Sequence, residues 1–503
     1  MSHITIFWII GLAVLSACAL MAQDRAKSAA SNALILLASL FVVATVWTSV
    51  TSGSKTMKSS SLVDADKADI LVRLQAAVET VSRSSSNRLL LEQRRNALQQ
   101  TEELVNKALV KSPENVPVMA RLAVVRKEEG KDIHAVLGGL NSMSTPEAKA
   151  LADALKKLYG PGKVTASEGK QVKQVIDANL PEGWYKTAAL FHLYKITKQN
   201  EAIGPLIREY DERNTNFLAR FVFFVVIFGI SFVVGIFVIL IQLFFLPRRI
   251  SSPEHTAQIA SPAPYGFKTI YSVLLAWIAT QLLVGLSLQS TLKSLHLMQY
   301  GVFVASLATA GFYILSNGPG LLYVYFLALK PKGMKFLDGI CLKFKVERNG
   351  PVRLAFYGLF TWFAAVPIVV IAYVVANKYL GSEGSNNPII ALVMEAARSS
   401  NIFATMVFYL TLGFFAPFVE ETIFRGFLYR GLRRYWSVFP SVVVSALVFA
   451  GVHLDLGGFL PLFCLGSLFA FVFERTRSIF PAMIAHGLWN SGTFSMVLLL
   501  FGN

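Results

Sequence analysis

Long apolar runs, separated by shorter polar segments, dominate the pattern of this 503-residue chain. A helix needs about 20 apolar residues to cross a bilayer. Runs of that order lie at 4–22, 33–50, 217–246, 270–288, 302–329, 354–375 and 402–419, and a less clean pattern continues at 438–452, 459–473 and 479–501. The pattern predicts an all-α, polytopic membrane helix bundle with about ten spans.

One polar segment, residues 55–216, interrupts this pattern between the second and third predicted spans. It reads as helical throughout, with a strongly amphipathic stretch at 88–111. The dipeptide Pro-Glu recurs at Pro113, Pro146 and Pro181, at intervals of 33 and 35 residues. Pro and Glu both favour the first turn of a helix, so the period resembles a tetratricopeptide-like (TPR-like) array of helical hairpins. An irregular helical domain is the alternative.

Composition and charge agree with a membrane protein. Hydrophobic residues make up 54% of the chain, charged residues only 15%, and the mean hydropathy is +0.53. Short cytoplasmic loops collect Lys and Arg, and the most basic loop is 330–353. Successive spans cross the membrane in alternating directions. Counted from this loop, all of the remaining basic clusters then lie on the cytoplasmic side, and residues 55–216 lie outside the cytoplasm. We therefore expect a multi-pass protein of the cell membrane, such as a bacterial inner membrane.

The net charge of +17 is explained by this topology, so no nucleic-acid partner is expected. The patterns divide the chain into four parts. Residues 1–54 are predicted to form two N-terminal transmembrane helices, and 55–216 a soluble helical repeat-like domain. Residues 217–386 are predicted to hold further transmembrane helices with the basic loop 330–353, and 387–503 form the C-terminal part.

Three polar motifs lie in the last apolar segments. Ionisable groups inside a bilayer cost several kcal/mol unless they are paired, so such groups are candidates for a functional site. The motifs are E-E-x-x-x-R, F-x-x-x-H and H-x-x-x-N, formed by Glu420, Glu421, Arg425, Phe449, His453, His486 and Asn490.

Helical spacing gives the two adjacent glutamates different surroundings. Residues four apart share one face of a helix, so Glu421 can reach Arg425 in a structural ion pair. Glu420 points about 100° away, without a local partner, and is expected to face a cavity. A lone histidine in a membrane helix is usually a packing residue. Two histidines, a free carboxylate and a carboxamide instead favour hydrolysis, with a base to activate water and donors to hold an oxyanion.

The height of the two histidines poses a geometric problem. At about 1.5 Å per residue, His453 would lie about 20 Å above its helix start near Pro440, and His486 only about 8 Å beyond Pro481. We therefore expect span 438–452 to tilt, to begin below the membrane plane, or to be partly re-entrant.

The three motifs together resemble the CAAX protease and bacteriocin-processing (CPBP) family of intramembrane endopeptidases, which includes the type II CAAX prenyl proteases. The resemblance covers residues 387–503 and implies a CPBP-like intramembrane protease domain there. It implies hydrolysis of peptide bonds in membrane-associated, lipidated or peptide substrates. It does not account for the preceding residues.

The resemblance also implies roles for the motif residues. Glu420 and His453 would activate water, while His486 and Asn490 would stabilise the oxyanion. The supporting residues would be Glu421, Arg425 and Phe449.

The sequence leaves the part played by a metal open. Glu420, His453 and His486 are the ligand types of a catalytic zinc with an open fourth position. However, the motif His-Glu-x-x-His is absent. Both a metalloprotease and a metal-free, glutamate-dependent endopeptidase are consistent with the spacing.

Two other classes of function are consistent with parts of the sequence. In the first, the protein is a non-catalytic scaffold or immunity-type protein, and residues 55–216 bind a protein partner. In the second, it is a proton-coupled transporter, which predicts inverted repeats of hydropathy that the chain does not show. The partners expected of an endopeptidase are the lipid bilayer and a protein or peptide substrate, with a protein partner of 55–216 as a further expectation.

Overall fold

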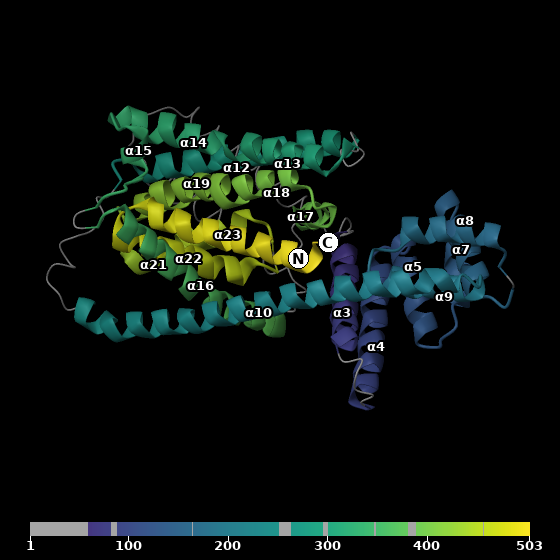
Figure 1. The fold of residues 1–503 in the computed structure, drawn as a ribbon. Helices are drawn as coiled ribbons and strands as arrows, with labels where there is room; N and C mark the ends of the chain where they lie inside the picture. The colour runs from purple at the N-terminus through teal and green to yellow at the C-terminus, as the bar shows by residue number, and fades with distance from the viewer. Residues whose placement is uncertain are drawn as a thin grey trace. The chain divides into compact units, whose positions relative to one another are not determined.

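The computed structural model describes residues 59–81, 88–162, 164–250, 263–294, 300–346, 349–380, 389–455 and 457–502. In this part the chain is helical, apart from turns and one isolated bridge between Val346 and Asn349 (Figure 1). The predicted all-α class is therefore confirmed. The spans predicted at 4–22 and 33–50 lie outside the described residues. The chain divides into two compact units, residues 56–225 and 226–502.

Seven helices in the described ranges are long and apolar enough to cross a membrane. They coincide with seven of the predicted spans, and an eighth predicted span is the shorter apolar helix α21 (Val438–Val452). The prediction of ten spans stays a prediction. The seven helices are α10 (Asn200–Ile250), α12 (Phe267–Ser294), α16 (Pro351–Leu380), α22 (Phe459–Thr476), α23 (Ile479–Phe501) and two composite helices, Val302–Lys332 and Ile402–Leu432.

The two composite helices contain π-helical segments, in which one extra residue is accommodated per turn. The first consists of α13 (Val302–Asn317), α14 (Pro319–Tyr323), the π segment η2 (Val324–Leu329) and the 3₁₀ turn η3 (Lys330–Lys332). The second consists of α18 (Ile402–Phe408), the π segment η4 (Tyr409–Phe415), α19 (Ala416–Glu421), the π segment η5 (Thr422–Tyr429) and α20 (Arg430–Leu432). Two shorter helices are α15 (Phe336–Gly339) and α17 (Ile389–Ser399).

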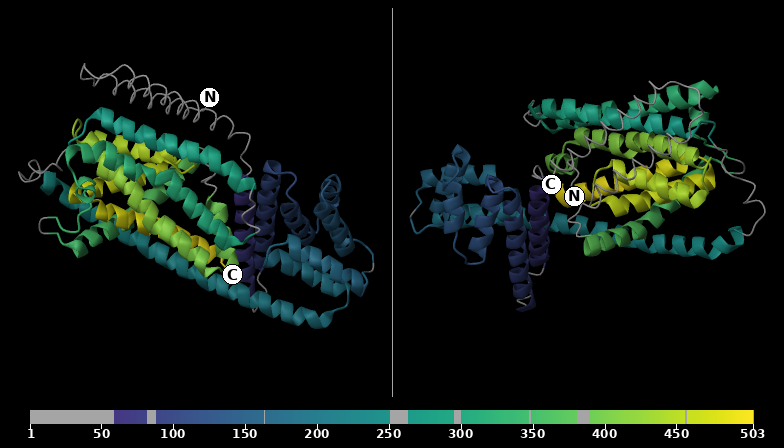
Figure 2. Two further views of the ribbon diagram at one scale, coloured as in Figure 1. Left: turned by 90° about the horizontal axis from the view of Figure 1, so that it is seen from above. Right: turned by 180° about the vertical axis from the view of Figure 1, so that it is seen from behind.

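The helices that carry the three motifs lie side by side within residues 226–502, here called the membrane unit (Figures 1 and 2). α23 packs against η4, α19, α16 and α22, and α21 packs along α22. α13 lies against both α12 and α18. The motif residues are thus carried on neighbouring helices although they are separated by up to 70 positions along the chain.

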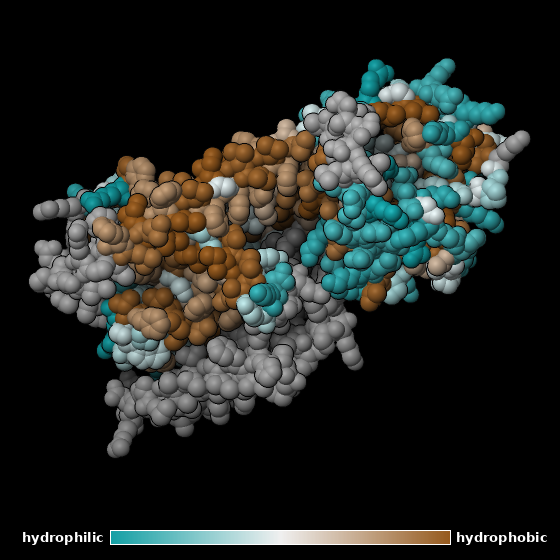
Figure 3. Space-filling model, turned by 90° about the horizontal axis from the view of Figure 1, so that it is seen from below, coloured by the Kyte–Doolittle hydropathy of each residue, from teal (hydrophilic) through white to brown (hydrophobic). Residues whose placement is uncertain are grey.

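Large apolar side chains cover much of the surface of the membrane unit. On α10, Ile230 is 58% exposed, Phe237 61% and Phe244 68%. The space-filling view shows the extended hydrophobic surface that such residues produce (Figure 3). Exposed apolar area of this extent is unfavourable in water and stable against lipid acyl chains. The protein is therefore a multi-pass membrane protein.

Close packing of α10 uses a glycine and a proline. Pro367 lies inside α16 and has no N–H for the carbonyl of Phe363, four residues earlier. Gly235 of α10 lies against this carbonyl, and a Cβ at Gly235 would collide with its oxygen. Ser231, one turn earlier on α10, is also buried. Such pairs of small residues let membrane helices approach closely.

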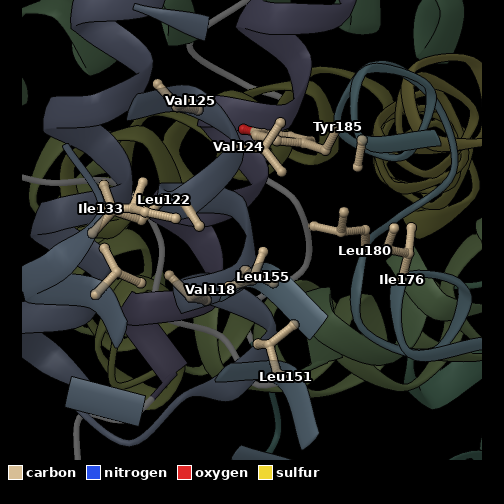
Figure 4. Close-up of a cluster of buried hydrophobic side chains, with 14 of the residues drawn as sticks. Val118, Leu122, Val124, Val125, Ile133, Leu151, Leu155, Ile176, Leu180 and Tyr185 are labelled. Carbon is tan, nitrogen blue, oxygen red and sulfur yellow. The ribbon is translucent and has the colours of Figure 1, made fainter. Parts of the chain in front are cut away.

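The other unit is a helical domain with its own core. It contains α3 (Ser59–Val81), α4 (Arg88–Lys111), α5 (Val116–Glu128), α6 (His134–Asn141), α7 (Pro146–Tyr159), α8 (Ala166–Asn179) and α9 (Trp184–Ile196). The bounds of α4 equal those of the predicted amphipathic stretch. Leu122, Leu151, Leu155 and Ile176 are among the buried residues of this core (Figure 4).

The Pro-Glu dipeptides do not all open helices. Pro146 is the first residue of α7, where the Thr145 side chain accepts a hydrogen bond as the N-cap. Pro113 and Pro181 instead precede their helices, because α5 starts after its cap Asn115 and α9 starts at Trp184. The expectation for these two positions was wrong, since turn residues follow each proline before the helix begins. The TPR-like repeat stays a prediction.

Candidate functional site

Glu420 lies near the end of α19, and its side chain is 12% exposed. Its Oε1 atom accepts a hydrogen bond of 3.0 Å from the hydroxyl of Tyr313 on α13. Its Oε2 atom is buried and has no hydrogen-bond partner among the described residues. The Nε2 atoms of His453 and His486 each lie 3.8 Å from this Oε2. The structure therefore places two imidazole nitrogens at 3.8 Å from one carboxylate oxygen.

Hydrogen bonds at the other ring nitrogens determine what the two Nε2 atoms can do. Nδ1 of His453 lies 2.7 Å from the carbonyl oxygen of Phe449, which can only accept, so Nδ1 carries the proton. Nδ1 of His486 lies 2.8 Å from Oε1 of Glu421 and donates to that carboxylate. In a neutral ring Nε2 therefore presents a lone pair toward Glu420, whereas in an imidazolium it carries a proton that it can donate. A water molecule has two protons, so it can donate to Glu420 Oε2 and to a neutral His453 Nε2 at the same time.

Glu421 forms the predicted ion pair with Arg425. Arg425 Nη1 lies 2.9 Å from Glu421 Oε1, and both side chains are fully buried. The guanidinium also donates to the carbonyl of Gly466 at 2.9 Å. The same Oε1 of Glu421 accepts from His486, a contact that helical spacing could not predict. Glu421 thus fixes both the arginine and the orientation of one imidazole.

Phe449 joins the arginine to the histidines. Its ring centroid lies 4.6 Å from the Arg425 guanidinium carbon, 4.9 Å from the His453 ring and 5.9 Å from the His486 ring. Phe469 of α22 stacks on His486, with ring centroids 5.1 Å apart and an interplanar angle of 21°. These rings hold the imidazoles in place and surround a buried cation with aromatic faces.

Asn490 lies one turn after His486 on α23 and is half-buried. Its Nδ2 donates a hydrogen bond of 2.9 Å to the carbonyl of Leu412 in η4. Among the described residues, no hydrogen bond joins Asn490 to Glu420, His453 or His486. One of its two amide protons is thus committed to the backbone, and the other is not used by this bond.

The difference in height that two straight vertical helices would give the histidines is absent, in agreement with the expectation that span 438–452 tilts or starts at another level. His453 directly follows α21, which has only 15 residues, while His486 lies in the first half of α23. Both Nε2 atoms nevertheless reach the same carboxylate oxygen. The two helices therefore do not run as vertical rods that start at one level.

The fit of a metal can be tested on the three candidate ligands. Glu420, His453 and His486 are suitable donor types for zinc. However, the described part of the chain contains no group of three or more His, Cys, Asp and Glu placed to hold a metal ion. In this arrangement the three side chains do not fit a metal centre.

A family model supplies the comparison that decides the identity of this region. The model described as type II CAAX prenyl endopeptidase Rce1-like matches residues 402–492, which include every residue of the three motifs. Residues 402–492 are an Rce1-like domain.

A bacterial relative matches part of this chain. A protein of Bacillus subtilis (strain 168) named "Putative membrane peptidase YdiL" is 30% identical over 121 residues, which are 24% of this chain. The matched segment covers 46% of that relative, so this chain spans less than half of the relative's length. No solved structure matches the chain.

Two residues of the site were not predicted from the sequence. Tyr313 lies outside the Rce1-like domain, and Phe469 lies inside it. Tyr313 had a weak signal, because Ser316 and Asn317 add polar groups to the same apolar span. Phe469 had none, because it is one of 38 phenylalanines in an apolar chain.

Proposed function

We propose that this protein is an intramembrane endopeptidase that hydrolyses peptide bonds of membrane-associated, lipidated or peptide substrates. The observation that carries the proposal is the convergence of Glu420 Oε2 with the Nε2 atoms of His453 and His486. The Rce1-like domain supports a CAAX-type membrane protease as the class of enzyme. The relative that is named as a membrane peptidase agrees with this class.

In the proposed first step, a water molecule lies between Glu420 Oε2 and His453 Nε2. His453 accepts one proton of the water in a hydrogen bond and orients it, because its Nδ1 already donates to Phe449. Glu420 removes the other proton as the water oxygen bonds to the scissile carbonyl carbon. The carbonyl double bond opens, and the tetrahedral intermediate carries an oxyanion.

In the proposed second step, His486 and Asn490 stabilise this oxyanion. For this step His486 carries a proton on each ring nitrogen, taken up from solvent before the attack and kept through the reaction, so that Nδ1 still donates to Glu421 while Nε2 donates to the oxyanion. The Glu421 carboxylate stabilises that positive charge. Asn490 offers the amide proton that Leu412 does not use. The C–N bond then breaks, and protonated Glu420 transfers its proton to the departing amine nitrogen.

A proteomic comparison tests the proposal. Membranes from cells with the wild type are compared with membranes from cells carrying Glu420→Gln, and peptides cut only by the wild type are identified. Glutamine keeps the shape of the side chain but is not a base, so these cleavages should disappear. Folding is checked by the yield and melting temperature of each purified protein in detergent.

Glu395→Gln on α17 is the matched control, because Glu395 is a half-buried carboxylate of the same unit that the mechanism does not use. Its cleavage pattern should equal that of the wild type. Cleavage that persists in a folded Glu420→Gln protein contradicts the role of Glu420. The absence of any difference between wild type and Glu420→Gln favours a non-catalytic scaffold.

The helical unit formed by residues 56–225 is proposed to recruit or gate substrates outside the cytoplasm. It contributes none of the motif residues and has its own buried core. Replacing residues 55–216 by a Gly/Ser linker should leave cleavage of a detergent-presented generic peptide and remove cleavage of the native target. If the native target is still cut at the full rate, the recruiting role is wrong. Loss of cleavage of both substrates by a folded variant contradicts it as well.

A further inference from the structure

Tyr313 connects a helix outside the Rce1-like domain to the proposed base. Its hydroxyl donates to Glu420 Oε1 at 3.0 Å, and its side chain is partly buried on α13. This is the one hydrogen bond that the Glu420 carboxylate accepts among the described residues. The bond leaves Oε1 engaged and Oε2, which faces the two imidazoles, open. The two oxygens of the carboxylate are therefore not equivalent.

Polar side chains fix the backbone turn that follows Tyr313. Asn317 Nδ2 donates to the Tyr313 carbonyl at 3.3 Å and to Ser316 Oγ at 2.9 Å. Gln281 of α12 donates to Asn317 Oδ1 at 2.5 Å, so a second helix holds this asparagine. Such side chains are costly inside an apolar span unless they bond to one another. The network fixes the end of α13 beside α12.

We infer that Tyr313 is a positioning residue for the base, so that Glu420 presents Oε2 to the attacking water. The inference rests on the proposed function and extends it to a residue that lies outside the matched family domain. Without this hydrogen bond the Glu420 carboxylate could rotate about its terminal torsion and present either oxygen to the water. The Tyr313 bond selects one rotamer, which keeps Oε2 at 3.8 Å from both Nε2 atoms.

The alternative for Tyr313 is simple packing. For packing alone, Phe would serve in this apolar helix as well as Tyr, because it has the same ring without the hydroxyl. Two observations favour a positioning role instead: the hydroxyl reaches a carboxylate oxygen directly, and the backbone behind it is held by Asn317 and Gln281. A purely packing role predicts that removal of the hydroxyl changes stability more than catalysis.

The test compares Tyr313→Phe with Tyr323→Phe. Tyr323 is the matched control, because its hydroxyl also bonds inside the membrane unit, to Thr280 at 2.8 Å, without touching the site. The substrate is an internally quenched peptide built on a cleavage site from the Glu420→Gln comparison. We expect Tyr313→Phe to lower kcat by about 10- to 100-fold, the effect of one hydrogen bond to a charged group, with KM changed less than about twofold. Tyr323→Phe should keep kcat.

Non-additivity provides the second measurement. In Glu420→Asp the carboxylate is one methylene shorter and moves out of reach of the Tyr313 hydroxyl. Tyr313→Phe should therefore cause less than about a threefold further loss in that background. Equal losses in both backgrounds overturn the inference, as does unchanged kcat in Tyr313→Phe. These outcomes differ from failure of the proposed function, in which Glu420→Gln itself keeps its cleavages.

Discussion

Gly487 on α23 lies so close to Gly413 on η4 that a Cβ at Gly487 would collide with the Gly413 carbonyl oxygen. Pro417 has no N–H for this carbonyl, which lies four residues earlier. A Cβ at Gly413 would in turn collide with Ser491 Oγ. Since Gly487 directly follows His486, this backbone contact sets the distance between His486 and the helix that carries Glu420.

Gly487→Ala should therefore weaken both the fold and the site. Overpacking of this kind costs about 1–3 kcal/mol, and the shift of α23 should also lower kcat. Gly492→Ala on the same helix is the control, because its nearest neighbour, the Trp362 side chain, would lie at 4.0 Å, an ordinary contact distance. Melting temperature and peptide cleavage are measured for both. Equal stability of the two variants would show that the helices separate without cost.

Glu421→Gln should reduce the folded yield more than Glu420→Gln does. It leaves Arg425 without its carboxylate in a fully buried position, and breaking a buried pair costs about 3–5 kcal/mol. Yield in the membrane and detergent unfolding are the measurements. A Glu421→Gln protein as stable as Glu420→Gln would contradict the structural role of the ion pair.

The double variant Glu421→Leu with Arg425→Met separates folding from catalysis. Replacing both partners of a buried pair by apolar residues is often neutral, so the folded yield should recover. Activity should not recover, because His486 Nδ1 has lost its acceptor. A folded double variant with wild-type kcat would show that Glu421 does not act through His486.

Removal of divalent metal should leave peptide cleavage unchanged. The proposed chemistry uses Glu420, His453 and His486 as base and hydrogen-bonding groups. Purified protein is treated with 1,10-phenanthroline and EDTA, dialysed, and assayed with the quenched peptide. A loss of activity that one equivalent of Zn²⁺ restores would instead assign these side chains as metal ligands.

Cysteine labelling tests the orientation. Lys332 is exposed in the basic loop, and Ser167 is exposed in the helical unit, so each is suited to replacement by cysteine. In a background without the native cysteines, a membrane-impermeant thiol reagent should label Lys332→Cys only from the cytoplasmic side. It should label Ser167→Cys only from the other side. Labelling of both from one side would overturn the charge-based topology.

The sequence predicted the helices and the residues of this site better than it predicted the contacts between those helices. The E-E-x-x-x-R spacing predicted the Glu421–Arg425 pair, and the apolar runs predicted the helices around it. It predicted Glu420 as a residue without a local partner, and the structure adds Tyr313 from a helix about 100 residues earlier. It did not predict that Glu421 also binds His486. The contacts that helical spacing predicted are local along one helix, whereas the grouping of Glu420, His453 and His486 in one site was predicted from their chemistry and from the family resemblance.

The order of the amino acids was enough to predict that this chain forms membrane helices, which of them carry ionisable groups, and which residues four apart share a face. Those properties depend on bilayer thickness and helix geometry, which are common to all helices. The packing of the helices was needed to show that Gly487 faces Gly413, that Phe469 stacks on His486, and that two Nε2 atoms lie near one carboxylate oxygen. A helix that is apolar on every side gives no pattern to choose its neighbour, because contact with lipid and contact with another helix are similarly apolar. The choice then rests on close packing and on polar contacts between helices.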